Sequence, residues 1–364
     1  MKRKVTDPVP AYWPADPYPI AFVGEAPGEE EAFAGAPFVG RSGWLIRAMC
    51  RDANIPINHC LITNSFDTRP VENNVKLFFL NKTEYKKWRG ENANAELRGH
   101  GGYGYIRPDH VYNTDRLAAE LREYKPRIIV ALGGTAMWVL TGEHKITEYR
   151  GTITRASELG LDIPVIPTFH PAAVLRQWEL RPTVVMDLIK ARLVAEGMST
   201  SPPERELWIN PTLTEVLEFV DTYVKPSPII GVDIETHWVE RLIRCIGISP
   251  DPHHCLVIPL IHTFNEKNSY SYWKPEEELV VRKILALILE DTTKKKLFHN
   301  AAYDVQWLAN EGMYTRGEIE DTMILHHALQ PELPKKLGFL GSIYTNEIAW
   351  KHMANFREGN KKDS

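Results

Sequence analysis

The stretch Ala21-Phe22-Val23-Gly24-Glu25-Ala26-Pro27-Gly28 indicates the fold of the first half of the chain. Its apolar run, which begins at Pro19, predicts a strand, and its glycines predict a loop where the backbone can approach a ligand closely. Open α/β sheets bind ligands at the carboxyl ends of their strands. The Glu25 carboxylate is therefore a candidate site residue, with Gly24, Pro27 and Gly28 beside it.

Strand-like and helical patterns alternate beyond this stretch, which predicts a parallel α/β sheet within residues 19–198. Residues 1–18 are rich in proline and aromatic residues and are expected to form an irregular lead-in. The predicted strands are 19–23, 60–63, 127–132 and 164–167, and the predicted helices are 43–54, 117–124 and 183–196.

Residues 71–112 interrupt this alternation and predict a long mobile insertion. It contains Arg98-Gly99-His100-Gly101-Gly102-Tyr103-Gly104-Tyr105. Aromatic and basic side chains in such a loop can stack on or grip DNA. A plain surface loop is an equally good interpretation.

The composition of residues 199–207 is that of a linker, and the pattern restarts after it. Residues 208–364 are therefore expected to form a second domain. A helix is predicted at 212–224, strands at 229–232, 244–248 and 254–260, and an amphipathic helix at 276–289. Strands that precede helices in this way favour an α+β domain.

Length and composition agree with two soluble domains, because 364 residues suffice for about two domains of roughly 100–200 residues. The formal net charge of -4 argues against a wholly basic nucleic-acid binder, so DNA contact would rely on local patches. No apolar run approaches the about 20 residues that span a membrane, and the N-terminus lacks a signal-peptide core. We expect a cytoplasmic protein without a membrane partner. The cysteines, Cys50, Cys60, Cys245 and Cys255, are interpreted as small buried apolar residues.

Further polar and aromatic residues follow the predicted strands of the first domain. Phe38 lies among small residues between Gly35 and Gly43, Asn64 ends a strand, and His170 precedes Pro171 in a loop. A flipped base needs an aromatic ring for stacking and an amide that reads its Watson–Crick edge. A carboxylate can position water or stabilise a cationic sugar, and a histidine can bond a base oxygen. Taken singly, each residue also has a structural interpretation. Glu25 could be a surface residue and Phe38 a core residue, while Asn64 could belong to a turn and His170 could be a packed histidine.

Together these stretches resemble the family 4 uracil-DNA glycosylases over about residues 18–195. The resemblance rests on 24–28, 37–43, Asn64 with Arg69-Pro70, 131–133 and 170–176. It implies that Glu25 handles water or the oxocarbenium ion, Phe38 stacks on the base, Asn64 recognises it and His170 bonds its carbonyl. It also implies that Arg176 lies in the DNA-facing loop, near phosphate.

This family holds a four-iron cluster through four cysteines. Here Thr68 stands at one cysteine position and Asn113-Thr114-Asp115 at another, and the N-terminal pair is absent. We therefore expect no iron–sulfur cluster. Base excision is less firmly implied than the fold, and a role in holding DNA without cleavage stays open.

Two carboxylates, Asp233 and Glu235, end the predicted strand 229–232. Because side chains alternate along a strand, both point to one face. Such a pair is usually solvated surface, but hard oxygen ligands at this spacing also suit Mg²⁺ or Mn²⁺. Asp304, four residues after Asn300, can complete such a site.

The pattern Asp233-x-Glu235 with Asn300-x-x-x-Asp304 resembles the first two motifs of DnaQ-like 3′-5′ exonucleases, most like the proofreading domain of family A DNA polymerases. The resemblance covers about 208–364 and implies an incomplete ribonuclease H-like α+β fold with two-metal hydrolysis. Asp321 is better interpreted as a helix N-cap. The last metal-binding carboxylate has no clear match, since Asp363 lies in unlike surroundings. We expect weak or no nuclease activity from residues 1–364 alone.

Three functions follow from this domain order. The first is the N-terminal part of a DNA polymerase of phage origin, which would be located in the host cytoplasm. It would bind single-stranded DNA or a primer 3′ end, with the polymerase domain on a separate polypeptide. The second is a stand-alone uracil-excision repair enzyme. The third is a non-catalytic DNA-binding and assembly module.

Overall fold

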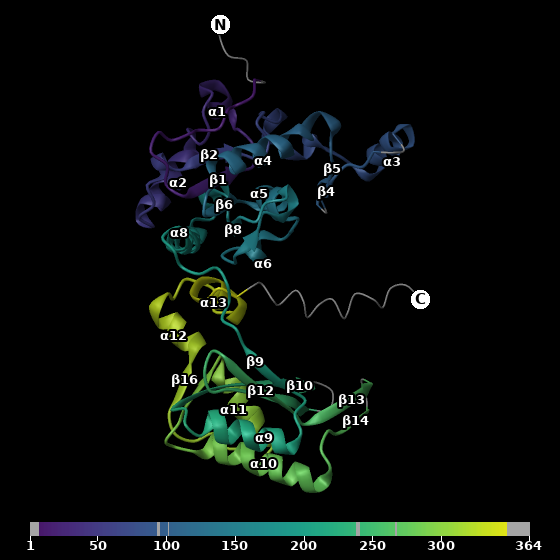
Figure 1. Cartoon of the computed structure of the whole chain (residues 1–364), viewed down its shortest axis with the longest axis vertical. Helices are drawn as coiled ribbons and strands as arrows, with labels where there is room; N and C mark the ends of the chain where they lie inside the picture. Colours follow the sequence, from purple (N-terminus) through teal and green to yellow (C-terminus); the bar gives the residue numbers. More distant parts are fainter. Residues whose placement is uncertain (1–6, 93–94, 101, 238–240, 266–267, 348–364) are drawn as a thin grey trace. The chain divides into compact units, whose positions relative to one another are not determined.

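The computed structural model describes residues 7–92, 95–100, 102–237, 241–265 and 268–347 (Figure 1). They form two compact units, Pro203–Leu337 and the remainder, which combines Met1–Pro202 with Gly338–Ser364. The start of the expected lead-in and the late carboxylate Asp363 lie outside the described residues. No helix in the described part of the chain is long and apolar enough to cross a membrane.

The first unit is built on a five-stranded sheet in the order β2-β1-β6-β8-β7 (Figure 1). All neighbours run parallel except β7, which is antiparallel to β8. The parallel α/β sheet predicted from the sequence is thus confirmed. The strands are β1 (Ile20–Gly24), β2 (Leu61–Asn64), β6 (Ile128–Leu132), β7 (Thr154–Arg155) and β8 (Pro164–Thr168).

Both faces of this sheet are buried, which explains why β1 and β6 are continuous apolar runs. Ile20 and Phe22 belong to one core cluster, and Ala21 and Val23 belong to the other. Helices α2 (Arg41–Asp52), α7 (Pro171–Arg176) and α8 (Arg181–Ala195) contribute to the first cluster, and α4 (Tyr112–Tyr124), α5 (Gly134–Thr141) and α6 (Ile146–Tyr149) to the second. The short α1 (Glu29–Ala34) follows β1.

The described part of the insertion, which we expected to be a long mobile loop, contains regular secondary structure. It forms a small antiparallel sheet of β3 (Phe79–Leu80), β5 (Gly104–Ile106) and β4 (Gly99–His100), with helix α3 (Lys82–Glu91). Asn81 and Glu84 form a capping box at the start of α3, and the ring of Tyr85 stacks on that of Tyr105 at 3.5 Å. A local capping box and an aromatic contact between residues far apart in sequence therefore help to give this segment its structure.

The second unit mixes strands and helices, which agrees with the predicted α+β class, although α9 precedes most of the strands. Its mixed sheet has the order β16-β15-β10-β11-β12-β9, and a separate hairpin is formed by β13 and β14. The strands are β9 (Glu206–Ile209), β10 (Ile229–His237), β11 (Leu242–Ser249), β12 (His254–Pro259), β13 (Ile261–Asn265), β14 (Asn268–Ser271), β15 (Lys295–Phe298) and β16 (Ile319–Asp321). The helices are α9 (Leu213–Phe219), which continues as a π-helix over Val220–Val224, α10 (Pro275–Glu290), α11 (Ala301–Asn310) and α12 (Thr322–Leu329).

Two elements lie differently from the expected domain plan. Strand β9 occupies the end of the expected linker and pairs in parallel with β12. Helix α13 (Leu337–Tyr344) follows the second unit in sequence, yet from Gly338 onward it packs with the first unit. Short 3₁₀ turns lie at Ile57–His59, Val71–Asn73, Val75–Phe78, Pro108–His110, Ser157–Leu159 and Trp178–Leu180.

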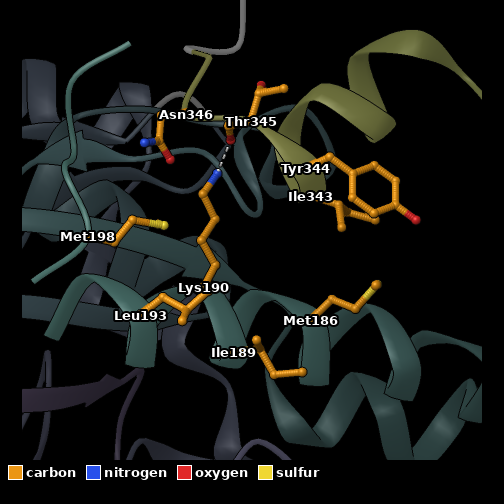
Figure 2. A pocket seen from close by; sticks show the side chains of 9 residues that line it. All are labelled: Met186, Ile189, Lys190, Leu193, Met198, Ile343, Tyr344, Thr345 and Asn346. Carbon is orange, nitrogen blue, oxygen red and sulfur yellow. Dashed lines mark hydrogen bonds between the residues drawn. The ribbon is translucent and has the colours of Figure 1, made fainter. Parts of the chain in front are cut away.

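Buried charges attach α13 to the first unit. The Arg150 guanidinium pairs with both Asp187 oxygens and donates to Ser342 Oγ at 3.0 Å. Lys190 Nζ donates to the backbone carbonyls of Gly151, Ser342 and Thr345 at 2.6–3.0 Å. Figure 2 shows Lys190 reaching from α8 to the Thr345 carbonyl, beside a mainly apolar pocket of about 240 Å³.

Candidate functional site

The first candidate site lies at the carboxyl ends of β1, β2 and β8. Strand pairing sets Gly24 opposite Asn64. A Cβ atom on Gly24 would lie 2.3 Å from Asn64 Oδ1 and 2.6 Å from Phe38 Cζ. The His170 ring centroid is 6.5 Å from that of Phe38. Asn64 and Phe38 therefore lie against Gly24, where only glycine leaves room for them, and His170 lies next to Phe38.

The Phe38 backbone is held in the left-handed region, with φ at 56°. This conformation is unfavourable for a large side chain and must be held by its surroundings. Glu31 accepts hydrogen bonds from the backbone N–H groups of Gly28 and Phe38. A Cβ atom on Gly43 would lie 1.9 Å from the Phe38 carbonyl oxygen. Glu31, which we did not single out from the sequence, thus fixes the loop that presents Phe38.

Glu25 is half-buried beside these groups. Burial raises the pKa of its carboxyl group, and a hydrogen bond from Thr135 partly opposes this rise. The Thr135 hydroxyl donates to Glu25 Oε2 at 2.5 Å. Sequence reasoning missed Thr135, although its place directly after Gly133-Gly134, where β6 turns into α5, was a usable signal.

His170 is held as a neutral hydrogen-bond donor. Its Nδ1 accepts from the Ala172 backbone N–H at 3.1 Å. Burial, with a smaller contribution from the Arg176 charge, lowers the pKa of His170 to about 4. A neutral imidazole carries one proton, so at neutral pH that proton is on Nε2.

The remaining predicted residues of this site take supporting places. The Asn64 side chain is buried, and its backbone carbonyl accepts from Arg116 Nη2 at 2.6 Å. Pro27 is buried, whereas Arg176 is exposed at the end of α7. Gly28 is the N-cap residue of α1.

The second candidate site lies on β10 and α11. Asp233 and Glu235 occupy the exposed face of β10, while Ile234 between them is buried. Asp304 is buried at the start of α11, and its Oδ1 accepts from the Ile234 backbone N–H at 3.1 Å. Burial and the nearby Asp233 raise the pKa of Asp304 to about 6. Carboxylates from two elements therefore approach each other here.

Asp321 has the capping role that we favoured. Its side chain accepts from the backbone N–H groups of Asn300, Ala301 and Met323 at 2.8–3.0 Å. Although burial opposes it, these hydrogen bonds hold the pKa of Asp321 below its ordinary value. Asn300 is exposed, with φ at 69°. Asp321 thus joins the starts of α11 and α12.

The oxygen donors of the second site suit Mg²⁺ or Mn²⁺ in kind. Within the described ranges, however, no three His, Cys, Asp or Glu side chains are grouped so that they could hold a metal ion. Of the cysteines, Cys50 and Cys60 lie in the same core cluster, as predicted, and burial raises the pKa of Cys60 to about 12. Cys245 and Cys255 are half-buried on β11 and β12.

Known proteins resemble both halves of the chain. A sequence model of the uracil DNA glycosylase superfamily matches residues 10–191, and one of the 3′-5′ exonuclease family matches 211–354. The type-4 uracil-DNA glycosylase of Thermotoga maritima is 34% identical over 177 residues, which are 48% of this chain and 76% of that protein. That of Archaeoglobus fulgidus is 28% identical over 176 residues, which are 47% and 74%.

Solved structures align less closely. Trypanosoma brucei RNase D gives a TM-score of 0.27 at 18% identity, over 34% of this chain and 40% of that one. The assignment rests instead on the two sequence matches and on the Thermotoga maritima relative. The chain belongs to the uracil DNA glycosylase superfamily through its N-terminal domain, which a 3′-5′ exonuclease domain follows.

Proposed function

We propose that the N-terminal domain hydrolyses the glycosidic bond of uracil in DNA. In this reaction Phe38 stacks on the flipped base, and the Asn64 amide reads its Watson–Crick edge. Glu25 positions the water that adds to the sugar or stabilises the cationic sugar. His170 Nε2–H donates to the base oxygen on which negative charge develops. Arg176 contacts phosphate.

The placement of His170, with its Nδ1 bonded to the Ala172 N–H and its ring beside Phe38, is the observation that carries this proposal. An imidazole whose Nδ1 accepts from Ala172 and whose pKa is about 4 offers one Nε2–H at neutral pH. It lies beside the ring of Phe38 and on the same edge of the sheet as Asn64. A hydrogen-bond donor such as His170 Nε2–H, next to the Phe38 ring and the Asn64 amide, can stabilise the negative charge that develops on a departing pyrimidine base.

The test uses a single-stranded oligonucleotide with one uracil, cleaved at the resulting abasic site by alkali. We expect cleavage by the wild-type chain, and strong loss in Glu25→Gln and Asn64→Ala. Tight DNA binding without base release by the wild type would instead favour the non-catalytic module.

We also propose that the second domain removes nucleotides from DNA 3′ ends. The support is the approach of Asp233 and Asp304, with Glu235 on the same strand face as Asp233. These three are the residues that would hold Mg²⁺ or Mn²⁺, but in this structure they are not grouped closely enough to do so, and their side chains would have to move together around the ion. When bound, the ion would activate water and stabilise the leaving oxygen. Asn300, exposed at the start of α11, would contact the DNA strand. From residues 1–364 alone we expect this activity to be weak. Mg²⁺-dependent shortening of a 5′-labelled oligonucleotide that disappears in Asp233→Ala would support the site, and shortening that persists would refute it.

A polymerase setting for the two domains is a further proposal. Its support is the order of the domains and the polymerase type of the matched exonuclease family. The finding that decides it is whether neighbouring reading frames encode polymerase motifs. Restored exonuclease activity on addition of that polypeptide would support a split enzyme, and unchanged activity would favour a stand-alone repair enzyme.

A further inference from the structure

Arg116, in the first half of α4, is bonded to the end of the strand that carries Asn64. Its Nη2 donates to the Asn64 backbone carbonyl at 2.6 Å and to the Ser65 carbonyl at 3.3 Å. Its Nη1 donates to Thr63 Oγ1 at 3.2 Å. A guanidinium is a planar fork that can donate to several acceptors at once. One side chain from α4 therefore contacts three consecutive residues where β2 ends.

The same stretch of chain is bonded to the loop that carries Glu25. The Ser65 backbone N–H and hydroxyl both donate to the Gly24 carbonyl at 2.8 Å. The Phe66 N–H donates to the Glu25 carbonyl at 3.0 Å. The end of β2 is thus held through its N–H groups by the loop after β1 and through its carbonyls by Arg116.

The Arg116 guanidinium is itself fixed by neighbouring side chains. Glu120, one helical turn further along α4, accepts from Arg116 Nη1 and from Thr63 Oγ1, both at 2.7 Å. Asn113 Oδ1 accepts from Arg116 Nε at 3.4 Å and from the Asp67 backbone N–H at 3.0 Å. The side chains of Arg116 and Glu120 are only 19% and 14% exposed, so water competes little for these bonds.

We propose that Arg116 is a positioning residue for the Asn64 amide, an inference that rests on the base excision proposed above. The Asn64 side chain leaves the backbone at the residue whose carbonyl Arg116 binds, so a shift of that backbone moves the amide. A group that reads a base must be held within about 0.5 Å of its productive place by the residues around it. Arg116 thus keeps Asn64 in register with Glu25.

Loss of the guanidinium has two expected consequences. The Asn64 and Ser65 carbonyls lose their donor, and Glu120 loses its cationic partner, so the end of β2 is less firmly held. A displacement of about 1 Å at a site can cost about 100-fold in rate. The affinity for DNA without uracil should be unaffected, because phosphate contacts dominate it.

Arg192 of α8 provides a matched control, because its bonds have the same pattern. It pairs with Glu196 one turn along its helix and donates to the Ala53 backbone carbonyl at 3.0 Å. Its side chain is 22% exposed, close to the value for Arg116. Ala53 follows the carboxyl end of α2 and is not one of the proposed site residues. Arg192→Ala therefore removes similar contacts without altering the strand that carries Asn64.

The experiment compares the full chain as wild type, Arg116→Ala, Arg116→Lys and Arg192→Ala, under conditions where circular dichroism shows each to be folded. Single-turnover release of uracil from a single-stranded oligonucleotide measures function, and the urea unfolding midpoint measures stability. Hydrogen exchange of the Ser65 and Phe66 amides, followed by NMR, measures how firmly the strand end is held without any need for activity. Guanidinium ion at low concentration is added to Arg116→Ala to replace the missing group.

We expect Arg116→Ala and Arg192→Ala to lower the unfolding midpoint by similar amounts. Only Arg116→Ala should lower the excision rate, by about 10- to 100-fold, with an unchanged dissociation constant for an oligonucleotide that lacks uracil. Arg116→Lys keeps the charge without the fork and should give an intermediate rate. Added guanidinium should restore part of the Arg116→Ala rate. Exchange of the Ser65 and Phe66 amides should quicken only in the Arg116 variants.

Wild-type excision by folded Arg116→Ala, or unchanged exchange of the Ser65 and Phe66 amides, would overturn the inference. Equal losses of excision rate in Arg116→Ala and Arg192→Ala would also overturn it, because they would follow from lower stability alone. If Arg116→Ala does not fold, Arg116→Lys serves for the same comparison. A wild type that excises nothing would refute base excision, while hydrogen exchange would still decide whether Arg116 holds the strand end.

Discussion

The Ala172 backbone N–H donates to His170 Nδ1 at 3.1 Å, so the first turn of α7 sets the tautomer of the histidine that ends the loop before it. The same imidazole has a pKa of about 4, below its ordinary value near 6.5, because it is buried and lies near Arg176. Protonation at low pH therefore opposes the folded state.

We predict that folding stability declines as the pH falls from about 6.5 to about 4, since the unfolded chain binds the proton first. Above pH 6.5 the contribution of His170 is fully present. In His170→Asn, which can still cap α7, this part of the decline should be absent. Urea unfolding midpoints measured at pH 7.5, 5.5 and 4.5 check this. Equal slopes in both proteins would show that other groups cause the decline.

Gly43→Ala should disable the glycosylase-like site without unfolding the domain. The added Cβ atom would lie 1.9 Å from the Phe38 backbone carbonyl, so the loop that presents the ring must move. We expect kcat/KM for uracil-containing DNA to fall at least about 100-fold, as displacements of about 1 Å can cost that much.

Gly90→Ala is the matched control for that substitution. It also replaces a helical glycine, but nothing lies within 4 Å of the added Cβ atom. It should leave excision unchanged and stabilise α3 by about 0.5–1 kcal/mol. If both variants excise at the wild-type rate, the Phe38 loop does not hold the base.

Substitutions of Asp304 and Asp321 should have opposite effects, with the first lowering nuclease activity and the second lowering folding stability. Asp304→Asn removes the carboxylate charge, so it should abolish nuclease activity. It keeps an oxygen that can accept from the Ile234 N–H, so the stability should be nearly unchanged. Asp321→Ala removes three backbone hydrogen bonds and should cost about 1–2 kcal/mol while activity persists in the folded fraction. Paired nuclease assays and urea unfolding check both. If Asp321→Ala abolished activity and Asp304→Asn only lowered stability, the roles assigned to the two residues would be wrong.

The Arg150–Asp187 pair should be a main determinant of stability in the first unit. Both side chains are buried, and Asp187 also accepts from Thr168 Oγ1 at 2.7 Å. Asp187→Ala leaves a buried guanidinium unpaired, for which we expect a loss of about 3–5 kcal/mol in unfolding free energy.

Asp162→Ala serves as the comparison for that variant. It breaks the exposed Arg155–Asp162 pair and should cost less than about 1 kcal/mol. Chemical denaturation of the full chain measures both losses. Similar small losses would mean that α13 and its polar neighbours rearrange around the missing carboxylate.

Local sequence was sufficient for the framework of both domains. Continuous apolar runs predicted β1 and β6, because burial leaves a periodic pattern. The start of β10 was also predicted, but its end was not, since the strand continues through Asp233 and Glu235 to His237. The spacing of Glu25, Phe38, Asn64 and His170 carried the family resemblance, because each lies at a fixed offset from a strand or loop.

The partners of these residues depended on the folded chain. Glu31 with Phe38, and Thr135 with Glu25, are contacts whose members are 7 and 110 residues apart in sequence, and no periodic pattern encodes them. The hydrogen bonds from Arg150 and Lys190 to Ser342 of α13 join residues that are still farther apart in sequence, by 192 and 152 positions. Burial sets the pKa values of Glu25, His170 and Asp304, and burial of a polar group is a property of the packed tertiary structure.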